Sequence, residues 1–322
     1  MKAVICTAYG GPEVLHMRHI LKPEPKAREI LIRTRATSVT HADFRIRSFT
    51  IPPPFGLPYR LVLGINKPRN PILGVELAGE VEAVGPEVNR FQPGDAVLAQ
   101  SLKRFGGYAE YICMQESELI VPKPERISFQ EAAAIPTGAR TALHYLRKAN
   151  IQPNQRMLIY GASGSVGSYA IQLARQMGAE VTAVCSRQNF DMVESLGADE
   201  AVDYQQHNWF MKIGKFDVVL VAVDKCPFVI CNDLLVEDGT YMNISTPVPE
   251  PAMIWTRMTS AKKIFSGETP PQSEEDLQYL AQLVAEKKLI VHIDRSYPLD
   301  QIVAAHRYVD TGRKRGNVVI EV

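Results

Sequence analysis

The pattern of apolar and polar residues changes character along the chain. Up to about residue 125, short segments alternate apolar with polar residues, which is typical of β-strands with one buried face. Residues 50–71 are rich in proline and apolar side chains, and we expect an ordered loop there that forms a pocket wall or a lid. The first third of the chain therefore predicts a β-rich domain. Its predicted strands are Lys2–Cys6, Glu29–Arg33, Gly74–Gly85 and, after a turn, Pro93–Leu98.

From about Ser128 the pattern becomes one of alternating helices and strands. Ser128 and Glu131 form a capping-box pair that predicts the start of a helix. Such alternation indicates a parallel sheet with right-handed crossovers. The predicted helices are 140–149, 168–177, 191–196 and 273–287, and the predicted strands are 157–160, 180–184, 201–204, 216–223, 238–245 and 316–322. The tail, from roughly residue 265, could complete the first domain.

The segment Met157–Gly167 carries the most specific chemical signal in the chain. It reads as an apolar strand that runs into a glycine-rich turn and then a helix. We expect Gly164 to permit a tight turn, Ser165 to stand where phosphate approaches the backbone, and Gly167 to bring helix and strand together. The helix N-terminus then presents N–H groups and the positive dipole end to phosphates. Purely structural turns also use glycine, but the helix and second strand that follow favour dinucleotide binding.

Composition and charge narrow the class of protein further. A chain of 322 residues is too long for one ordinary core, so two domains are expected. The net charge of +1 gives no electrostatic reason for nucleic-acid or membrane binding. No apolar run approaches the ~20 residues needed to span a bilayer, and nothing resembles a signal peptide. Five cysteines without paired metal spacing predict free thiols and a cytoplasmic protein.

With these elements placed, the chain resembles the medium-chain dehydrogenases/reductases of the zinc-independent quinone oxidoreductase type. The resemblance covers nearly the whole length, and its motifs follow one another in order. They are Tyr9–Val14, Gly74–Gly79, Phe91–Val97, Gly106–Glu110, Gly161–Gly167, Leu196–Asp199 and Gly316–Ile320. It implies an α/β protein with a GroES-like substrate domain, residues 1–125 completed by 265–322, and a Rossmann domain, residues 126–264. It also implies a homodimer that acts on a small-molecule substrate.

The resemblance raises the question of zinc. Relatives that use zinc bind the catalytic ion through two cysteines and a histidine, and the corresponding positions here hold Thr40, Val75 and Thr137. Valine has no ligating atom, and we therefore expect no metal. His41 and Glu76 stand beside these positions, and a site rebuilt from them is the alternative. Without a Lewis acid, hydride transfer to a quinone or an activated alkene is easier than alcohol oxidation.

The residues after the second strand of the dinucleotide-binding unit indicate the cofactor. NAD-specific sites carry a carboxylate there, whereas this chain has Ser186 and Arg187, which favour NADP(H). The alternative is that Arg187 is a solvated residue at the start of a helix. By resemblance, Tyr204 helps to hold the 2′-phosphate. The other expected cofactor-binding residues are Thr137, Thr141, Gly161, Ala162, Ser163, Gly164, Ser165, Val166, Gly167, Val223, Ser245 and Asn317.

The sequence offers more than one candidate for the proton donor. Tyr59, in the proline-rich loop, offers a phenol, and Thr40 offers a hydroxyl at a former ligand position; solvent is the alternative source. Asp43 and Arg47 stand four residues apart on a predicted helical turn, and we expect an ion pair between them. The sequence thus favours an NADPH-dependent quinone or enone reductase. A zinc-free carbonyl or aldehyde reductase and a non-catalytic NADPH-binding redox sensor are the alternatives.

Overall fold

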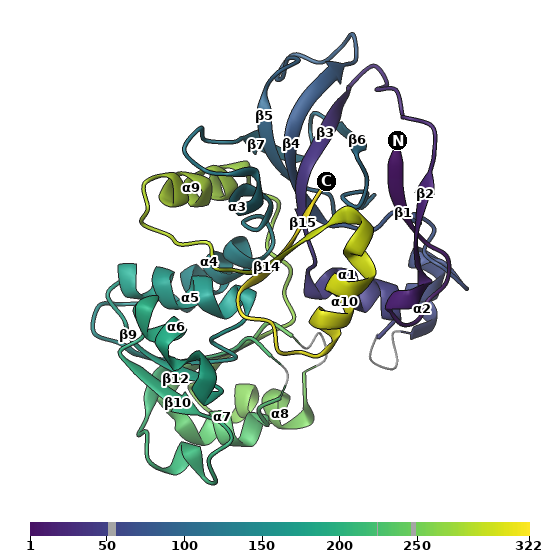
Figure 1. Ribbon diagram of the computed structural model, residues 1–322. Helices are drawn as coiled ribbons and strands as arrows, with labels where there is room; N and C mark the ends of the chain where they lie inside the picture. Colours follow the sequence, from purple (N-terminus) through teal and green to yellow (C-terminus); the bar gives the residue numbers. More distant parts are fainter. Residues whose placement is uncertain (51–55, 224, 246–248) are drawn as a thin grey trace. The chain divides into compact units, whose positions relative to one another are not determined.

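The computed structural model describes residues 1–50, 56–223, 225–245 and 249–322. The chain forms two compact units, one of residues 1–137 with 272–322 and one of residues 138–271 (Figure 1). The sequence suggested boundaries after residues 125 and 264, earlier than those observed. The first boundary lies later because helix α3 (Phe129–Ala133) packs against strands of the first unit. Its capping box, with Ser128 and Glu131, forms as predicted.

A mostly antiparallel sheet organises the first unit. Along it lie β14 (Ile293–Pro298), β15 (Asn317–Glu321), β3 (Glu29–Ser38), β4 (Glu76–Val84), β5 (Ala96–Gln100) and β7 (Leu119–Pro122). Strand β6 (Tyr111–Gln115) also pairs with β3, and β1 (Lys2–Cys6) with β2 (Leu15–His19) forms a separate antiparallel pair. The tail supplies β14 and β15, and β15 pairs directly with β3. The tail therefore completes the first unit, as the sequence suggested.

Helices of the first unit include two that the sequence did not predict, at Gly56–Leu63 and Ile302–Asp310. They are α1 (His41–Ser48), α2 (Gly56–Leu63), α3, α9 (Glu274–Ala285) and α10 (Ile302–Asp310). Helix α2 lies within the expected loop of residues 50–71, of which residues 51–55 fall outside the described part. Pro58 is compatible with this helix because it stands in the first turn, where its missing N–H is not needed. The loop prediction was therefore wrong for Gly56–Leu63.

The second unit is built on the predicted parallel sheet. Its strand order is β10 (Glu200–Asp203), β9 (Glu180–Cys185), β8 (Arg156–Tyr160), β11 (Phe216–Val221), β12 (Leu235–Asn243) and β13 (Lys263–Ser266). Its helices are α4 (Gly138–Ala149), α5 (Ser165–Gln176), α6 (Phe190–Ser195), α7 (Phe228–Leu234) and α8 (Pro251–Thr259). The chain starts in the middle at β8, runs to one edge, and returns to β11 to run to the other. Ligands of such sheets bind beyond the strand ends where the order reverses.

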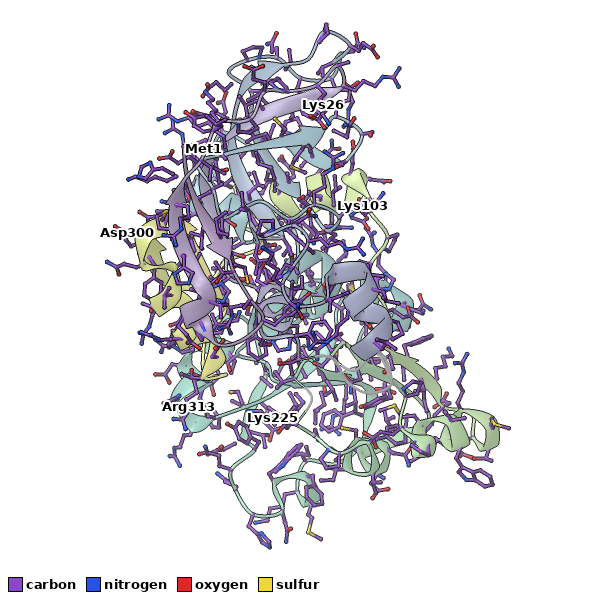
Figure 2. The ribbon with its side chains drawn as sticks, turned by 90° about the vertical axis from the view of Figure 1, so that its right-hand side faces the viewer. Met1, Lys26, Lys103, Lys225, Asp300 and Arg313 are labelled. Carbon is purple, nitrogen blue, oxygen red and sulfur yellow. The ribbon has the colours of Figure 1, made fainter. Side chains whose placement is uncertain are left out.

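Burial follows from this architecture. Strand β11 is apolar over almost its whole length, and its residues Val218–Val221 are buried, because helices cover both faces of a parallel sheet. Each unit has its own apolar core, and side chains fill the space around each sheet (Figure 2). Among the described residues, no helix is long and apolar enough to cross a bilayer. The mixed α/β class expected from the sequence is confirmed.

Candidate functional site

The glycine-rich turn of the second unit connects the end of β8 to the start of α5. Its first residues are anchored to β9, because the Gly161 and Ala162 N–H groups donate to the Val184 carbonyl at 3.0 and 3.2 Å. The left-handed position is Gly161, with φ +80°, whereas Gly164 has φ −80° and ψ 177°. The tight turn therefore requires glycine at position 161. The prediction from the sequence that Gly164 has this role was wrong. A Cβ on Gly161 would also lie 2.8 Å from Cγ2 of Val223.

Helix α5 begins at Ser165, directly after this turn. Its N-cap is Gly164, which has no side chain to occupy the first N–H groups, and its first turn holds no acidic residue. A Cβ on Gly167 would lie 2.4 Å from the Gly161 carbonyl oxygen, so glycine is what lets the helix approach the turn. The turn and the helix start thus form a backbone cradle, with a positive dipole end suited to phosphate.

A small polar cluster stands beside this cradle, at the end of β9. The Asn189 side-chain N–H₂ donates to Ser163 Oγ and to Ser186 Oγ, both at 3.0 Å. Asn189 is buried, and its Oδ1 has no hydrogen bond within the described residues. Arg187 is exposed at the start of the 3₁₀ turn Arg187–Asn189. Sequence reasoning missed Asn189, although a polar residue two positions past Arg187 was a signal for it.

Other expected cofactor residues of the second unit lie at the same edge of the sheet. The Tyr204 N–H donates to the Cys185 carbonyl at 3.3 Å, and Ser245 Oγ donates to the Ala222 carbonyl at 3.1 Å. Tyr204 and Val223 are both partly exposed, at 42% and 37%. The structure therefore brings the turn, Ser186, Tyr204, Val223 and Ser245 to the carboxyl ends of the strands. Thr141 lies on α4 and Val166 on α5, both partly buried.

In the first unit, Thr40 forms the N-cap of α1. Its Oγ1 donates to Asp43 Oδ2 at 2.6 Å and accepts the Asp43 N–H at 3.2 Å, which completes a capping box. The other carboxylate oxygen of Asp43 accepts from the Gly74 N–H at 3.0 Å. Burial raises the pKa of Asp43 to about 6, although these hydrogen bonds act in the opposite direction. The hydroxyl hydrogen of Thr40 is therefore committed to a buried carboxyl.

Thr137 is paired with a second buried carboxyl. The Thr137 N–H donates to Glu76 Oε2 at 2.7 Å, and Thr137 Oγ1 accepts from Gln100 Nε2 at 3.0 Å. Ser38 Oγ donates to the other oxygen of Glu76. Burial raises the pKa of Glu76 to about 7, and the nearby charge of Asp43 adds to the effect. Two threonines at former ligand positions thus each stand beside a carboxyl that can hold a proton near neutral pH.

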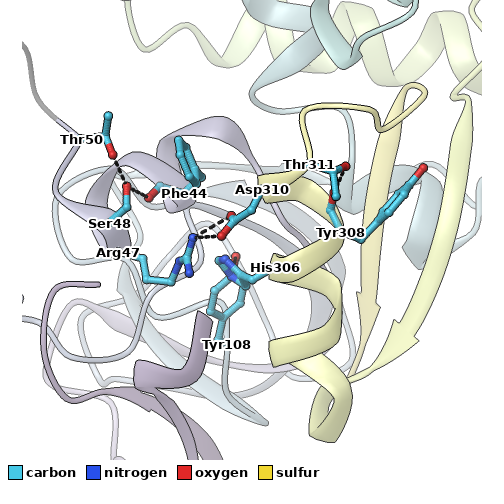
Figure 3. A network of polar contacts seen from close by, with 9 residues as sticks. All are labelled: Phe44, Arg47, Ser48, Thr50, Tyr108, His306, Tyr308, Asp310 and Thr311. Atoms are coloured by element: carbon cyan, nitrogen blue, oxygen red, sulfur yellow. Dashed lines mark hydrogen bonds and ion pairs between the residues drawn. The ribbon is translucent and has the colours of Figure 1, made fainter. Parts of the chain in front are cut away.

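The predicted ion pair between Asp43 and Arg47 is wrong. Arg47 is fully buried, and its Nη2 donates to both carboxylate oxygens of Asp310 at 2.7 Å (Figure 3). Asp43 instead accepts from the backbone and from Thr40. The helical spacing therefore gave the wrong partner, because α10 brings a competing carboxylate from a distant part of the chain. The Nε and Nη1 atoms of Arg47 have no hydrogen-bond partner within the described residues.

His306 and Tyr108 complete this buried network. His306 Nε2 lies 3.2 Å from the Tyr108 hydroxyl (Figure 3). That hydroxyl donates to the Ser38 carbonyl at 3.3 Å. Burial lowers the pKa of His306 to about 3, with a further contribution from the charge of Arg47. The ring is therefore neutral at physiological pH. The sequence did not single out His306, since a histidine on an amphipathic helix has no motif around it.

Two expected site residues lie elsewhere in the first unit. Tyr59 is on α2 with 45% of its surface exposed. Asn317 is buried at the start of β15, and its backbone N–H and side-chain N–H₂ both donate to the His292 carbonyl, at 2.9 and 3.2 Å.

The residues at the three former zinc positions do not suit a metal ion. Val75 is wholly buried in the apolar core, and the hydroxyl of Thr40 is engaged with Asp43. Glu76, which could have rebuilt a site, has both carboxylate oxygens engaged by Ser38 and Thr137. Across the described ranges, no three histidine, cysteine, aspartate or glutamate side chains gather as a metal site would need.

Comparison with known proteins places the chain in a family. Residues 26–125 match the alcohol dehydrogenase GroES-like domain, and residues 196–320 match the zinc-binding dehydrogenase family. A chloroplast quinone-oxidoreductase homolog of Spinacia oleracea is 33% identical over 100% of this chain and 98% of its own. The chloroplast NADPH-dependent alkenal/one oxidoreductase of Arabidopsis thaliana is 28% identical, over 99% of this chain and 79% of its own.

A solved structure agrees with these matches. The quinone oxidoreductase from Coxiella burnetii superposes with a TM-score of 0.90 and 30% identity, over 100% of this chain and 99% of that one. The antiparallel first unit and the parallel second unit correspond to the GroES-like and Rossmann-type domains of such enzymes. The chain therefore belongs to the medium-chain dehydrogenase/reductase superfamily, among its quinone oxidoreductase-like members.

Proposed function

We propose that this protein is a zinc-independent reductase that transfers hydride from NADPH to a quinone, an enone or a similar activated alkene. The observation that carries the proposal is full-length similarity to proteins named for quinone and alkenal/one reduction. The zinc-independent part rests on the residues Thr40, Val75 and Thr137, which supply no ligand set for a metal.

The residues of the second unit would hold the cofactor. The N–H groups at the start of α5 fit a pyrophosphate, because the helix itself offers them no acceptor, and Gly161 shapes the turn that leads to them. Val223 and Ser245, at the carboxyl ends of the sheet, would border the nicotinamide half. When bound, the reduced nicotinamide supplies the hydride. Three further cofactor contacts are proposed from the resemblance: Thr141 of the second unit, and Thr137 and Asn317 of the first.

The cluster at the end of β9 favours the phosphorylated cofactor. The Asn189 amide donates hydrogen bonds to Ser163 and Ser186. Its Oδ1 has no partner among the described residues and can accept a hydrogen bond from a bound ligand. Arg187 adds a permanent, planar cation, and none of the residues 186–189 directly after β9 carries a carboxylate that would repel a 2′-phosphate. Tyr204 stands beside the end of β9 and would flank the same group.

The substrate oxygen gains negative charge as hydride arrives, and it needs hydrogen-bond donors or a proton. Thr137 is partly exposed and adjoins Glu76, whose raised pKa lets it hold a proton near neutrality. The side chains of both threonines bond to a carboxyl, Thr40 to Asp43 and Thr137 to Glu76, but Thr40 is only 8% exposed, so it is the less accessible donor. Tyr59 is exposed and offers a phenol, and solvent is the remaining source. We propose Thr137 with Glu76 ahead of Tyr59.

The test is the rate of NADPH loss with a panel of quinones, enones and aldehydes, repeated with NADH and with a metal chelator. Turnover of quinones or enones with NADPH that survives chelation supports the proposal. Turnover of aldehydes alone identifies the zinc-free carbonyl reductase instead. Tight NADPH binding without turnover of any substrate identifies a non-catalytic sensor, and activity lost on chelation refutes the zinc-independent reaction.

A substitution at Arg187 tests the preference for NADPH over NADH. Arg187→Ala removes the exposed cation, and we expect the KM for NADPH to rise about tenfold while the KM for NADH hardly changes, because only the former carries the extra phosphate. The matched control is Gln188→Ala, an exposed neighbour without charge. Equal changes in both KM values for Arg187→Ala would refute the assignment of Arg187 to the 2′-phosphate.

We also propose a homodimer in the cytoplasm. The dimer is expected from the resemblance, and the second unit offers β13 as an edge strand that a second copy could extend. The five free cysteines suit a reducing compartment. Sedimentation of the purified protein tests the dimer, and fractionation of its source cell tests the location.

A further inference from the structure

Two cysteines of the second unit stand side by side without being bonded. The Sγ atom of Cys231 lies 3.3 Å from that of Cys226 and donates its hydrogen to it. Both belong to the apolar core of this unit, with Cys226 6% exposed and Cys231 wholly buried. Neither residue takes part in the proposed function, and no cofactor contact was expected of them.

Their proximity follows from the local backbone. Pro227 is the N-cap of α7, so Cys226 occupies the position before the cap and Cys231 the fourth position of the helix. Side chains at these two positions pack together in the hydrophobic staple that fixes how a chain enters a helix. In this staple both members are thiols. The local fold of the six residues from Cys226 to Cys231 therefore keeps the two sulfurs close to each other.

The two thiols are not equivalent in reactivity. The hydrogen bond from Cys231 favours the anion of Cys226 and lowers the pKa of the Cys226 thiol, whereas the same bond and burial raise the pKa of Cys231. Cys226 is also the one with some exposed surface. Cys226 is therefore suited to react first with a small oxidant, and Cys231 to resolve the product.

The side chain of Tyr160 connects the segment that carries Cys226 to the proposed cofactor site. The Tyr160 hydroxyl donates to the carbonyl of Lys225, the residue just before Cys226 and labelled in Figure 2, at 3.4 Å. The Tyr160 ring lies 6.1 Å from that of Tyr204, centroid to centroid. Along the chain, Tyr160 directly precedes Gly161, the left-handed residue of the phosphate turn. A shift of the segment at Cys226 would therefore be passed by Tyr160 to the glycine-rich turn and to Tyr204.

We propose that Cys226 and Cys231 form a reversible disulfide on exposure to hydroperoxides, and that this bond weakens binding of NADPH by the second unit. Forming the bond shortens the sulfur separation from 3.3 Å to about 2 Å, and the accompanying shift of Cys226 would disturb the hydrogen bond between Tyr160 and the adjacent Lys225 carbonyl. The effect on NADPH rests on the proposed function, whereas formation of the disulfide does not.

The chemistry balances with a hydroperoxide as the oxidant. The Cys226 thiolate attacks the terminal peroxide oxygen, the O–O bond breaks, and an alcohol leaves with a proton, so that Cys226 becomes a sulfenic acid. The Cys231 sulfur then attacks Cys226, the S–O bond breaks, and water leaves with the proton of Cys231. Each sulfur gives up one electron in total, and the peroxide takes both.

The first experiment measures the bond itself. The whole protein is treated with a slight excess of hydrogen peroxide, digested under acid conditions, and analysed by mass spectrometry with counting of free thiols. We expect a loss of two thiols, a peptide containing a Cys226–Cys231 bridge, and recovery of both thiols with dithiothreitol. Cys113→Ser, at a partly exposed cysteine on β6, is the control and should behave as the unchanged protein. Oxidation that stops at sulfinic acid, or bridges to other cysteines, would overturn the proposal.

The second experiment measures NADPH affinity by fluorescence before and after oxidation. We expect the Kd for NADPH to rise about tenfold in the oxidised protein and to return with dithiothreitol, and saturating NADPH to slow disulfide formation by a similar factor, because linkage is reciprocal. Cys226→Ser and Cys231→Ala should each abolish the response. An unchanged Kd in a protein shown to carry the disulfide would refute the coupling.

Two further measurements keep the outcome clear. If either cysteine variant fails to fold, phenylarsine oxide replaces it, because the arsenic bridges two adjacent thiols of the unaltered protein; failure to take up one arsenical per chain would overturn the pairing. Reduced protein that binds no NADPH at all would refute the proposed function, while the thiol count still decides whether the disulfide forms.

Discussion

The phosphate turn of the second unit and the buried polar network of the first unit are built in opposite ways. The turn uses backbone groups from one continuous segment, Gly161–Gly167, and owes its shape to small residues. The network uses side chains from distant segments, because Arg47 on α1 meets Asp310 on α10. The turn leads to the first N–H groups of α5, which have no acceptor within the helix, whereas the network pairs the Arg47 charge with Asp310 in the interior.

This contrast teaches where each region is vulnerable. A continuous backbone motif tolerates changes in its neighbours but not in the few glycines that shape it. A buried network of charges depends on every partner, because an ion without its counter-ion is costly to keep away from water. The two regions should therefore respond differently to single substitutions.

The largest effect is expected at the ion pair of Arg47. Asp310→Ala leaves a fully buried guanidinium without its counter-ion, and we expect the free energy of unfolding to fall by about 3–5 kcal/mol. Arg47→Met removes the buried charge itself and should lower the free energy of unfolding by less, since the Asp310 carboxylate that it leaves unpaired is partly exposed to water. Urea unfolding measures both. Glu87→Ala, at the exposed pair with Arg28, is the control and should change little. An equal loss for Asp310→Ala and Arg47→Met would show that burial of the charge is unimportant.

The second prediction concerns pH and Glu76. Its pKa is raised from 4.5 to about 7 in the folded protein, so between these values the folded state holds a proton that the unfolded chain has released. The stabilisation is complete below pH 4.5 and disappears as the pH rises to about 7, and it amounts to about 3 kcal/mol. Glu76→Gln should abolish this pH dependence, and it is accommodated because Ser38 can accept from the amide while the Thr137 N–H donates to its oxygen.

The measurement is the free energy of unfolding from about pH 5 to about pH 8. The charged or titratable groups near Glu76 are Asp43, Tyr108 and Lys314, and they are present in both proteins. Glu80→Gln, on the same strand but partly exposed and paired with Arg35, is the matched control. Parallel pH curves for the unchanged protein and Glu76→Gln would contradict the prediction.

The smallest effect separates two glycines of the phosphate turn. Gly161→Ala places a side chain at φ +80° and against Val223, and we expect a loss of about 1–3 kcal/mol in the free energy of unfolding. Gly164→Ala keeps a negative φ, and its Cβ would meet only the Gly161 carbonyl oxygen, at 3.4 Å, so its loss should stay below about 0.5 kcal/mol. Thermal unfolding of the two variants checks the order, and a reversed order would place the strain at Gly164.

The contrast between contiguous and distant contacts also explains which features could be predicted from the sequence. The parallel sheet, the capping box at Ser128 and the position of the glycine turn were predicted correctly, because their signals lie within a few neighbouring residues. The helix at Gly56–Leu63 was missed because prolines and the absence of a polar face concealed its period. The glycine that adopts the left-handed conformation was misplaced by three residues, since the motif alone does not give φ.

The buried network was beyond local reasoning. Spacing suggested that Arg47 pairs with Asp43, but the choice between two carboxylates depends on α10, more than two hundred residues further along the chain. The roles of His306 and Asn189 were missed for the same reason, because their partners are distant in sequence or belong to another loop. The residues of the glycine turn could be proposed as a cofactor site from the sequence because they are contiguous.

The pairing of β15 with β3 has a consequence for how the chain folds as it is made. The second unit is one continuous segment and can fold as soon as it has left the ribosome, whereas the sheet of the first unit stays open at β3 until β15 has been made. At the usual speed of synthesis this delay is on the order of ten seconds. Protease treatment of stalled nascent chains should find residues 138–271 protected before residues 1–137. During that interval Arg47 has no Asp310 to meet, and the N-terminal segment, although made first, is the last part of the protein to reach its final structure.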